Sequence, residues 1–96
     1  MRFKANALPA NRRPTHPGEI LLEDFLKPLG ISQVGLAKKL GIPVQRVNTI
    51  VAGKRGITAE TALLFARFFE TTPQLWMNLQ NACDLWDAQR RLERAG

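Results

Sequence analysis

A glycine and a proline two positions apart, Gly41 and Pro43, constrain this chain most strongly, because they separate two short segments of helical periodicity. Before the glycine, Leu36, Ala37 and Leu40 recur at i, i+1 and i+4 and form one apolar face of a helix. Helices often end at a glycine, which adopts φ > 0 at low cost, and proline with its fixed φ suits the start of a helix. The sequence therefore predicts two short helices joined by a turn of about three residues.

The second of these helices has apolar residues on one side and polar residues on the other. Val47, Ile50 and Val51 recur at i, i+3 and i+4, so they face inward together. The residues of the outward face and its flanks are Gln45, Arg46, Asn48, Thr49 and Ala52. Their polar groups can hydrogen-bond base edges or phosphates, and alanine can pack against a thymine methyl. Two helices in this arrangement are typical of the helix-turn-helix motif, whose second helix lies in the major groove of DNA.

The charge distribution favours the same interpretation. The chain carries a net charge of +6 and has a pI near 10.5, which favours an anionic partner. Residues 32–56 contain five basic residues and no acidic one, a concentration that a merely solvated helix face does not explain. Lys54 and Arg55, in the loop after the second helix, suit a phosphate better than a base, and so do the backbone N–H groups of that loop.

Helical patterns extend over the rest of the chain. We expect an all-α fold of five helices near residues 17–28, 32–40, 44–52, 58–69 and 73–89. A length of 96 residues with 45% apolar content suits a single domain. Residues 1–15 lack periodicity, and we expect a flexible basic arm that serves either solubility or the binding of DNA or a protein partner. Residues 16–96 then form the DNA-binding and dimerisation domain.

The last predicted helix has a long apolar stripe that ends at Trp86, after which we expect the helix to fray. Its two tryptophans, Trp76 and Trp86, are better explained as core residues than as residues that stack on a ligand. The residues expected on its solvated side are Asn78, Gln80, Asn81, Asp84 and Asp87.

The motif occurs once, so a second recognition helix must come from another subunit. One such helix reads only a few base pairs, and specific binding uses two half-sites about one DNA turn, roughly 34 Å, apart. The predicted helix near residues 58–69 is apolar nearly all round, which indicates burial on more than one side. The apolar residues predicted to form a homodimer interface are Leu64, Phe68, Leu75, Trp76 and Leu79.

The residues of an active site or a metal centre are missing from the sequence. His16 is the only histidine and has no second ligand at metal spacing, and Cys83 is the only cysteine. No nucleophile with a histidine partner and no glycine-rich phosphate loop is present. No apolar run reaches the roughly 18 residues of a membrane span, and Asn6, Pro9 and Asn11 interrupt any signal-peptide core. We therefore expect a cytoplasmic protein that is not an enzyme and binds neither a metal, a cofactor nor a membrane.

Several motifs at fixed spacing resemble known regulators. The chain resembles the lambda-type phage repressor and Cro superfamily, often called XRE. The residues that carry this resemblance are Ser32, Gln33, Leu36, Ala37, Gly41, Ile42, Val47, Ile50 and Gly53. A narrower resemblance to the HigA antitoxins covers about residues 16–87, and its motifs include His16-Pro17-Gly18-Glu19, Gly53-Lys54-Arg55 and Trp76-Met77-Asn78-Leu79-Gln80. The resemblance implies a lambda-repressor-like domain that forms a homodimer and binds the operator of its own operon. It also implies that the protein neutralises a HigB-type ribonuclease toxin.

The resemblance assigns roles to individual residues. Gln33 would hold a phosphate from the first turn of its helix, and Lys54 and Arg55 would hold the DNA backbone. Val44 stands where many relatives carry a polar residue that reads a base. The positions expected to face or flank the groove are Val44, Gln45, Arg46, Asn48 and Thr49.

Two alternative functions remain open from the sequence. The first is a stand-alone XRE-family repressor without a toxin partner, in which residues 1–16 would serve DNA binding. The second is a basic helical adaptor between proteins that makes no contact with DNA. A neighbouring reading frame for a small RelE-fold toxin would favour the antitoxin over both.

Overall fold

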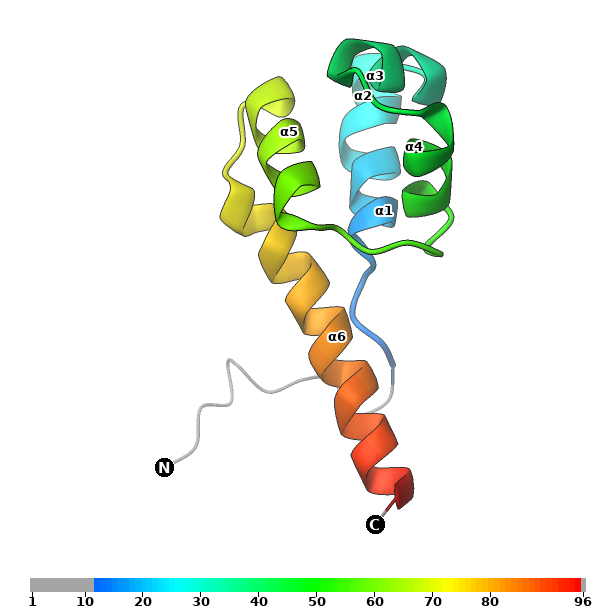
Figure 1. Ribbon diagram of the computed structural model, residues 1–96, viewed down its shortest axis with the longest axis vertical. Helices are drawn as coiled ribbons and strands as arrows, with labels where there is room; N and C mark the ends of the chain where they lie inside the picture. Colours follow the sequence, from blue (N-terminus) through cyan, green and yellow to red (C-terminus); the bar gives the residue numbers. More distant parts are fainter. Residues whose placement is uncertain (1–11, 96) are drawn as a thin grey trace.

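The computed structural model describes residues 12–95, and over that range the chain is helical without a strand. The elements follow in the order α1 (Pro17–Ile20), η2 (Leu21–Leu26), α2 (Lys27–Leu29), α3 (Gln33–Leu40), α4 (Val44–Val51), α5 (Ala59–Phe69) and α6 (Pro73–Ala95) (Figure 1). Because α1, η2 and α2 run on without a break, they form one helix, and the predicted all-α fold of five helices is confirmed. Four of the five helices in this range begin and end within one residue of the predicted bounds.

Local signals set the ends of the helices. The Oγ of Ser32 accepts the Gly35 N–H at 2.9 Å at the start of α3, and Gly41 ends that helix with a φ of 69°. Thr58 caps α5 in the same way, since its Oγ1 accepts the Thr61 N–H at 3.3 Å. The predicted end of a helix at Gly41 is confirmed, and Ser32 and Thr58 cap the starts of α3 and α5.

The first helix contains a wider turn that the sequence did not predict. In η2 the backbone follows a π-helical pattern, which ends with the Lys27 N–H donating to the Leu22 carbonyl. Pro28, in the next turn, has no N–H, and in a regular α-helix its ring would meet the carbonyl four residues back. A widened turn before the proline relieves that contact, and the helix continues to Leu29.

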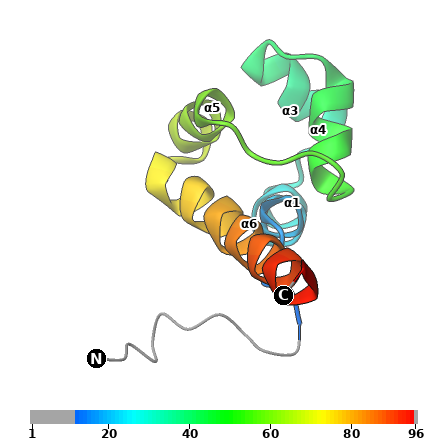
Figure 2. The same ribbon diagram turned by 60° about the horizontal axis from the view of Figure 1, so that its bottom comes forward.

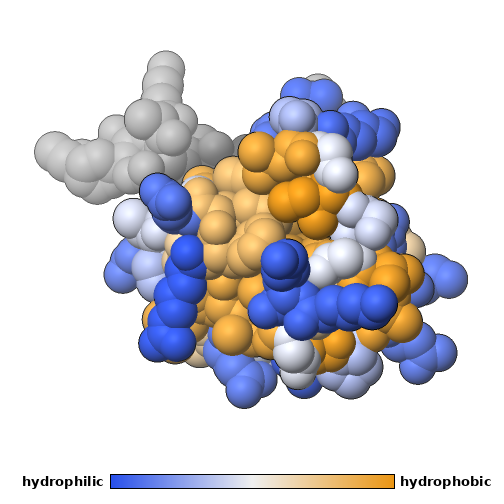
Figure 3. Space-filling view, turned by 90° about the horizontal axis from the view of Figure 1, so that it is seen from above, coloured by the Kyte–Doolittle hydropathy of each residue, from blue (hydrophilic) through white to orange (hydrophobic). Residues whose placement is uncertain are grey.

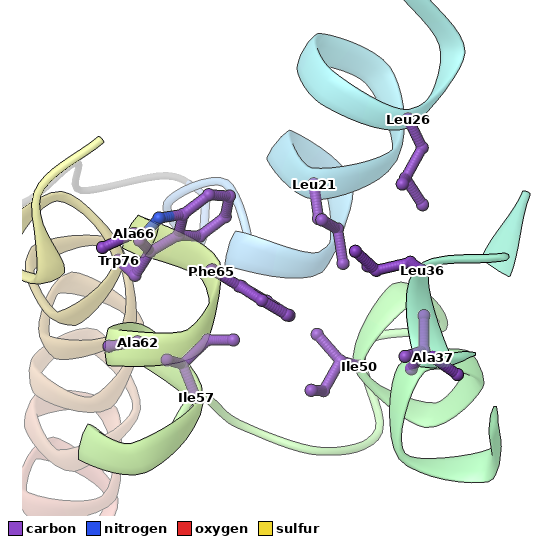
Figure 4. Packing of buried hydrophobic residues seen from close by; sticks show 11 residues of the cluster. Leu21, Leu26, Leu36, Ala37, Ile50, Ile57, Ala62, Phe65, Ala66 and Trp76 are labelled. Carbon is purple, nitrogen blue, oxygen red and sulfur yellow. The ribbon is translucent and has the colours of Figure 1, made fainter. Parts of the chain in front are cut away.

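One apolar core joins the first helix, the helix-turn-helix, α5 and the start of α6 (Figure 4). Leu36, Val47 and Ile50 have no exposed surface, as predicted for the apolar faces of α3 and α4. Phe65 and Trp76 meet edge to face with their ring centroids 5.0 Å apart on the other side of the core. The core therefore holds α3 and α4 against the remaining helices.

The helix α6 is longer than predicted. It continues to Ala95 and projects beyond the other helices (Figure 1), so the expectation that it frays after Trp86 is wrong. Residues 87–95 contain no glycine or proline and consist mostly of good helix formers. The Arg90 guanidinium also lies over the Trp86 ring, 5.0 Å from its centroid. These local interactions sustain the helix where its apolar burial ends.

The segment before α1 is tied to α6, and Figure 2 shows α1 lying beside that helix. Arg13 donates from Nε and Nη2 to the two carboxylate oxygens of Asp87, at 2.9 and 2.8 Å. The buried thiol of Cys83 donates to two backbone carbonyls of the same segment, at 3.4 and 3.6 Å. The last residues of the predicted arm thus contact α6, and residues 1–11 of that arm lie outside the described residues.

Among the helices described, none is long and apolar enough to cross a membrane. Residues 12–95 also hold no group of three or more His, Cys, Asp or Glu side chains that could bind a metal ion.

Candidate nucleic-acid interface

Close packing against α1 and α3 holds α4 in place. Gly18 lies so near the end of α4 that a Cβ built on it would be 1.8 Å from the carbonyl oxygen of Ile50. Any larger residue at this position would therefore push the two helices apart. On the other side, the Ile42 N–H donates to the Ala37 carbonyl at 3.1 Å and closes the turn between α3 and α4. The helix predicted to read DNA is thus supported from both sides.

A histidine caps the helix that makes this close contact. The Nδ1 of His16 accepts the Gly18 N–H at 2.9 Å, which requires that nitrogen to be unprotonated. Burial is the main cause of a lowered pKa of His16, and the nearby Arg13 adds to the shift. The neutral side chain is therefore the form that the fold favours.

The outward face of α4 presents two amides. Gln45 and Asn48 are exposed, and neither side-chain amide makes a hydrogen bond within the part of the chain that the structure describes. Their spacing of three residues places them on neighbouring turns of one helix face, and the exposed Ala52 continues it. Amides in this position can make bidentate contacts with adenine. The structure brings these predicted site residues together.

Thr49 and Arg46 have partners within the protein. The half-buried Oγ1 of Thr49 lies within hydrogen-bond distance of the Gln45 and Arg46 carbonyls, at 2.8 and 3.1 Å. Because its hydroxyl hydrogen is used inside the helix, Thr49 can offer only its methyl group and oxygen lone pairs to an outside molecule. The Nη1 of Arg46 lies 3.4 Å from Oε1 of Glu60 in the first turn of α5. A surface ion pair of this kind is worth about 1 kcal/mol or less, so it holds Arg46 only weakly.

Two further predicted contact residues, Gln33 and Val44, are half-buried at the starts of consecutive helices. Val44 packs against the core, so part of its side chain serves stability. Gln33 lies in the first turn of α3, where free N–H groups and the positive end of the helix favour a phosphate. Gln33 thus fits its predicted role better than Val44 does.

The loop after α4 presents two exposed cations, Lys54 and Arg55, whose backbone N–H groups are already bonded within the protein. Their N–H groups both donate to the Thr49 carbonyl, at 2.9 and 3.2 Å, and the Gly53 N–H donates to Ile50 at 3.0 Å. The expectation that the N–H groups of Lys54 and Arg55 serve a phosphate is therefore wrong. The side chains of Lys54 and Arg55 form no ion pair among the described residues, and those of Lys38 and Lys39 on α3 form none either.

Gln80 on α6 closes the other end of this loop, a role that the sequence pattern did not reveal. Its Oε1 accepts the Ile57 N–H at 2.7 Å, and its Nε2 donates to Oδ1 of Asp84 at 2.9 Å. Gln80 is only 8% exposed, so the prediction that it lies on the solvated side of its helix is wrong. Its spacing from Trp76 and Cys83, i+4 and i−3, is that of one helix face and could have revealed the burial.

The predicted dimer residues differ in how much surface they offer. Leu64, Phe68 and Leu79 are half-buried and Leu75 is 37% exposed, so each offers apolar surface to a second chain. Trp76 has no exposed surface, because it is packed among aromatic rings and donates Nε1–H to a threonine hydroxyl at 2.8 Å. Its assignment to the interface is therefore corrected. At the end of the molecule where α2, α3 and α5 lie, hydrophobic surface extends between hydrophilic groups (Figure 3).

Comparisons with known proteins match this geometry to a family of regulators. The family described as "Helix-turn-helix" matches residues 22–76. The "Virulence-associated protein I" of Dichelobacter nodosus is 48% identical over 85 residues, which are 88% of this chain and 75% of that protein. An "Uncharacterized HTH-type transcriptional regulator" of Haemophilus influenzae is 44% identical over 78 residues, 81% of this chain and 73% of that protein. The solved structure of the Pseudomonas aeruginosa antitoxin HigA with the higBA promoter is similar with a TM-score of 0.82 and 42% identity, covering 86% of this chain and 90% of that one.

Proposed function

The chain belongs to the helix-turn-helix family and to its HigA-type group, and from this premise we propose that it is an operator-binding antitoxin that represses its own toxin–antitoxin operon. One observation carries the DNA-binding part of this proposal. The exposed amides of Gln45 and Asn48 belong to residues 32–56, which contain no acidic residue. The lysines Lys38, Lys39 and Lys54 and the arginine Arg55 of this segment form no ion pair within residues 12–95. Such a face combines the two requirements of sequence-specific binding, base contacts and phosphate contacts.

We assign the contacts as follows. Gln45 and Asn48 read base edges in the major groove, and Thr49 adds its methyl group to the same face. The residues that hold phosphates are Gln33, Arg46, Lys54 and Arg55. Val44 supports the start of α4 and contributes at most an apolar contact.

The operator-binding form is proposed to be a homodimer. Two copies of α4 on one face of DNA supply the two half-sites that one chain cannot read. The apolar residues Leu64, Phe68, Leu75 and Leu79 provide a surface for an isologous contact between two chains.

Neutralisation of a HigB-type toxin rests on the family alone, and we assign no residue to it. A stand-alone regulator is the second candidate, because the similar Haemophilus influenzae protein is described only as a transcriptional regulator. For both candidates we propose a cytoplasmic location.

Selection of DNA by the purified chain tests the proposal. The full chain is incubated with random duplexes, and the bound sequences are recovered and compared with the region upstream of its own reading frame. We expect a palindromic sequence that occurs in that region. A set of unrelated bound sequences would contradict operator recognition.

Expression of the adjacent reading frame separates the two candidates. If that frame encodes a toxin, its expression should stop growth, and co-expression of this chain should restore growth. Growth arrest that this chain does not relieve, or the absence of a toxic neighbour, would leave the stand-alone regulator as the function.

A further inference from the structure

A buried polar side chain outside the helix-turn-helix lies directly behind the loop that carries Lys54 and Arg55. Gln80 belongs to α6, yet its amide binds that loop, because Oε1 accepts the Ile57 N–H at 2.7 Å. Its Nε2 donates to Asp84 at 2.9 Å, which fixes the amide with its oxygen towards the loop. Because both amide atoms are used and the side chain is only 8% exposed, Gln80 offers nothing to an outside ligand.

The loop is shaped to receive this amide. A Cβ built on Gly56 would lie 2.9 Å from each of the three terminal atoms of Gln80, so the amide lies flat against the backbone of Gly56. Gly56 does not have a positive φ, and the need for glycine there comes from the close approach of Gln80. The contact therefore depends on residues from both α6 and the loop.

The two halves of the loop are held by different helices. The N–H groups of Lys54 and Arg55 bind the Thr49 carbonyl, so the first half follows the end of α4. The second half is held by Gln80 through Ile57, whose own side chain is buried in the core. Without the glutamine oxygen, the buried Ile57 N–H loses its acceptor, and the loop must move to bring that group to water. Such a movement displaces the two cations that come just before it.

We propose that Gln80 is a positioning residue for DNA binding, which fixes the loop so that Lys54 and Arg55 meet the phosphates in the geometry that α4 requires. In this role Gln80 couples α6 to the DNA backbone, through contacts that run from Asp84 to Gln80 and from Gln80 to Ile57 in the loop. This role rests on the proposed phosphate contacts of Lys54 and Arg55.

A double-mutant cycle on the full chain tests this role. The first variant is Gln80→Met, which keeps the side-chain volume and loses both hydrogen bonds. The second carries Lys54→Ala and Arg55→Ala together, and the third carries all three changes. Gln89→Met is the matched control, because Gln89 is an exposed glutamine on the same helix. The probe is a duplex selected from a random pool by the wild-type chain, and affinity is measured at several salt concentrations with folded protein.

We expect Gln80→Met to weaken binding about tenfold and to reduce the slope of log K against log salt by about one for each phosphate that the variant no longer holds. In the variant that lacks Lys54 and Arg55, Gln80→Met should weaken binding less than about twofold, because the cations through which Gln80 acts are absent. Gln89→Met should bind like the wild type. A purely structural role would weaken binding equally in both backgrounds and leave the salt slope unchanged, and that result would overturn the proposal.

A rescue experiment keeps the test valid if Gln80→Met does not fold. Gln80→Glu keeps an acceptor for Ile57 but places two carboxylates together, and the additional change Asp84→Asn supplies a donor to the new carboxylate. The double variant should bind within about threefold of the wild type, and the single Gln80→Glu should be weaker. Equal binding by both variants would overturn the proposal. If the variant without the two cations binds like the wild type, the proposed phosphate contacts fail instead.

Discussion

Replacement of Gly18 by alanine should separate α1 from α4 and destabilise the whole domain. The added Cβ would lie 1.8 Å from the Ile50 carbonyl oxygen and 2.7 Å from its carbonyl carbon. An ordinary contact between a Cβ and a carbonyl oxygen exceeds about 3 Å, so the helices must move apart by more than about 1 Å at a contact formed by backbone atoms. The core residue Leu21 follows Gly18 in the same helix and would move with it.

We estimate a loss of about 3 kcal/mol or more in the free energy of unfolding, the upper part of the range for overpacking. The better helix propensity of alanine offsets at most about 1 kcal/mol of the gross cost. For a domain of this size, about 3 kcal/mol corresponds to a fall in Tm of roughly 12–24 °C. Chemical unfolding followed by circular dichroism at one protein concentration measures the change.

Gly35→Ala is the matched control. Its Cβ would meet only the Oγ of Ser32, at 3.1 Å, and the methyl group of an isoleucine at 3.8 Å. A shift of a few tenths of an ångström by the exposed Ser32 side chain relieves the first contact and keeps the cap on the Gly35 N–H. The control should therefore stay within about 1 kcal/mol of the wild type or gain stability. If Gly18→Ala unfolded at the same denaturant concentration as Gly35→Ala, the close contact that supports α4 would be wrong.

Three further outcomes are expected. Phe68→Asp should give a folded monomer in sedimentation experiments and lose operator binding, and a dimer of undiminished strength would exclude this surface as the interface. The cap formed by His16 should stabilise the fold fully above its unfolded pKa of 6.5 and lose its effect as the pH falls through the lowered folded pKa. In His16→Asn, whose side chain can cap the same helix, this step should be absent from the stability profile, and its persistence would assign it to another group. Lys54→Ala should reduce the salt slope of DNA binding by about one per chain, with little change in sequence preference, as filter binding at several salt concentrations would detect.

The helix-turn-helix could be predicted from the sequence because its signals are local. Ser32 caps one helix, Gly41 ends it with a positive φ, and the spacing of Val47 and Ile50 identifies the buried face of the next. Each of these choices depends on a few neighbouring residues. The outward position of Gln45 follows from the same spacing.

Two of the features that the sequence did not reveal depend on contacts between distant segments. Periodicity placed Trp76 on an apolar stripe but could not show that the neighbouring helices cover it completely. Gln80 is polar, and its burial depends on an N–H group 23 residues away that needs an acceptor. The extension of α6 to Ala95 depends on pairs of side chains rather than on a core. The complete burial of Trp76 and the partner of Gln80 depend on tertiary packing, which a local pattern does not contain, whereas the extension of α6 follows from local interactions.

The central claim is that α4 reads the operator through the amides of Gln45 and Asn48. Its most direct test is the ratio of the affinities for the selected duplex and for an unrelated duplex. The ratio is measured for the wild type, for the double variant Gln45→Ala with Asn48→Ala, and for the control Asn81→Ala, which removes an exposed amide from α6. The double variant should lose about 1–3 kcal/mol of discrimination for each base contact while its affinity for the unrelated duplex stays the same. Asn81→Ala should keep the wild-type ratio. An unchanged ratio in the double variant would contradict the claim.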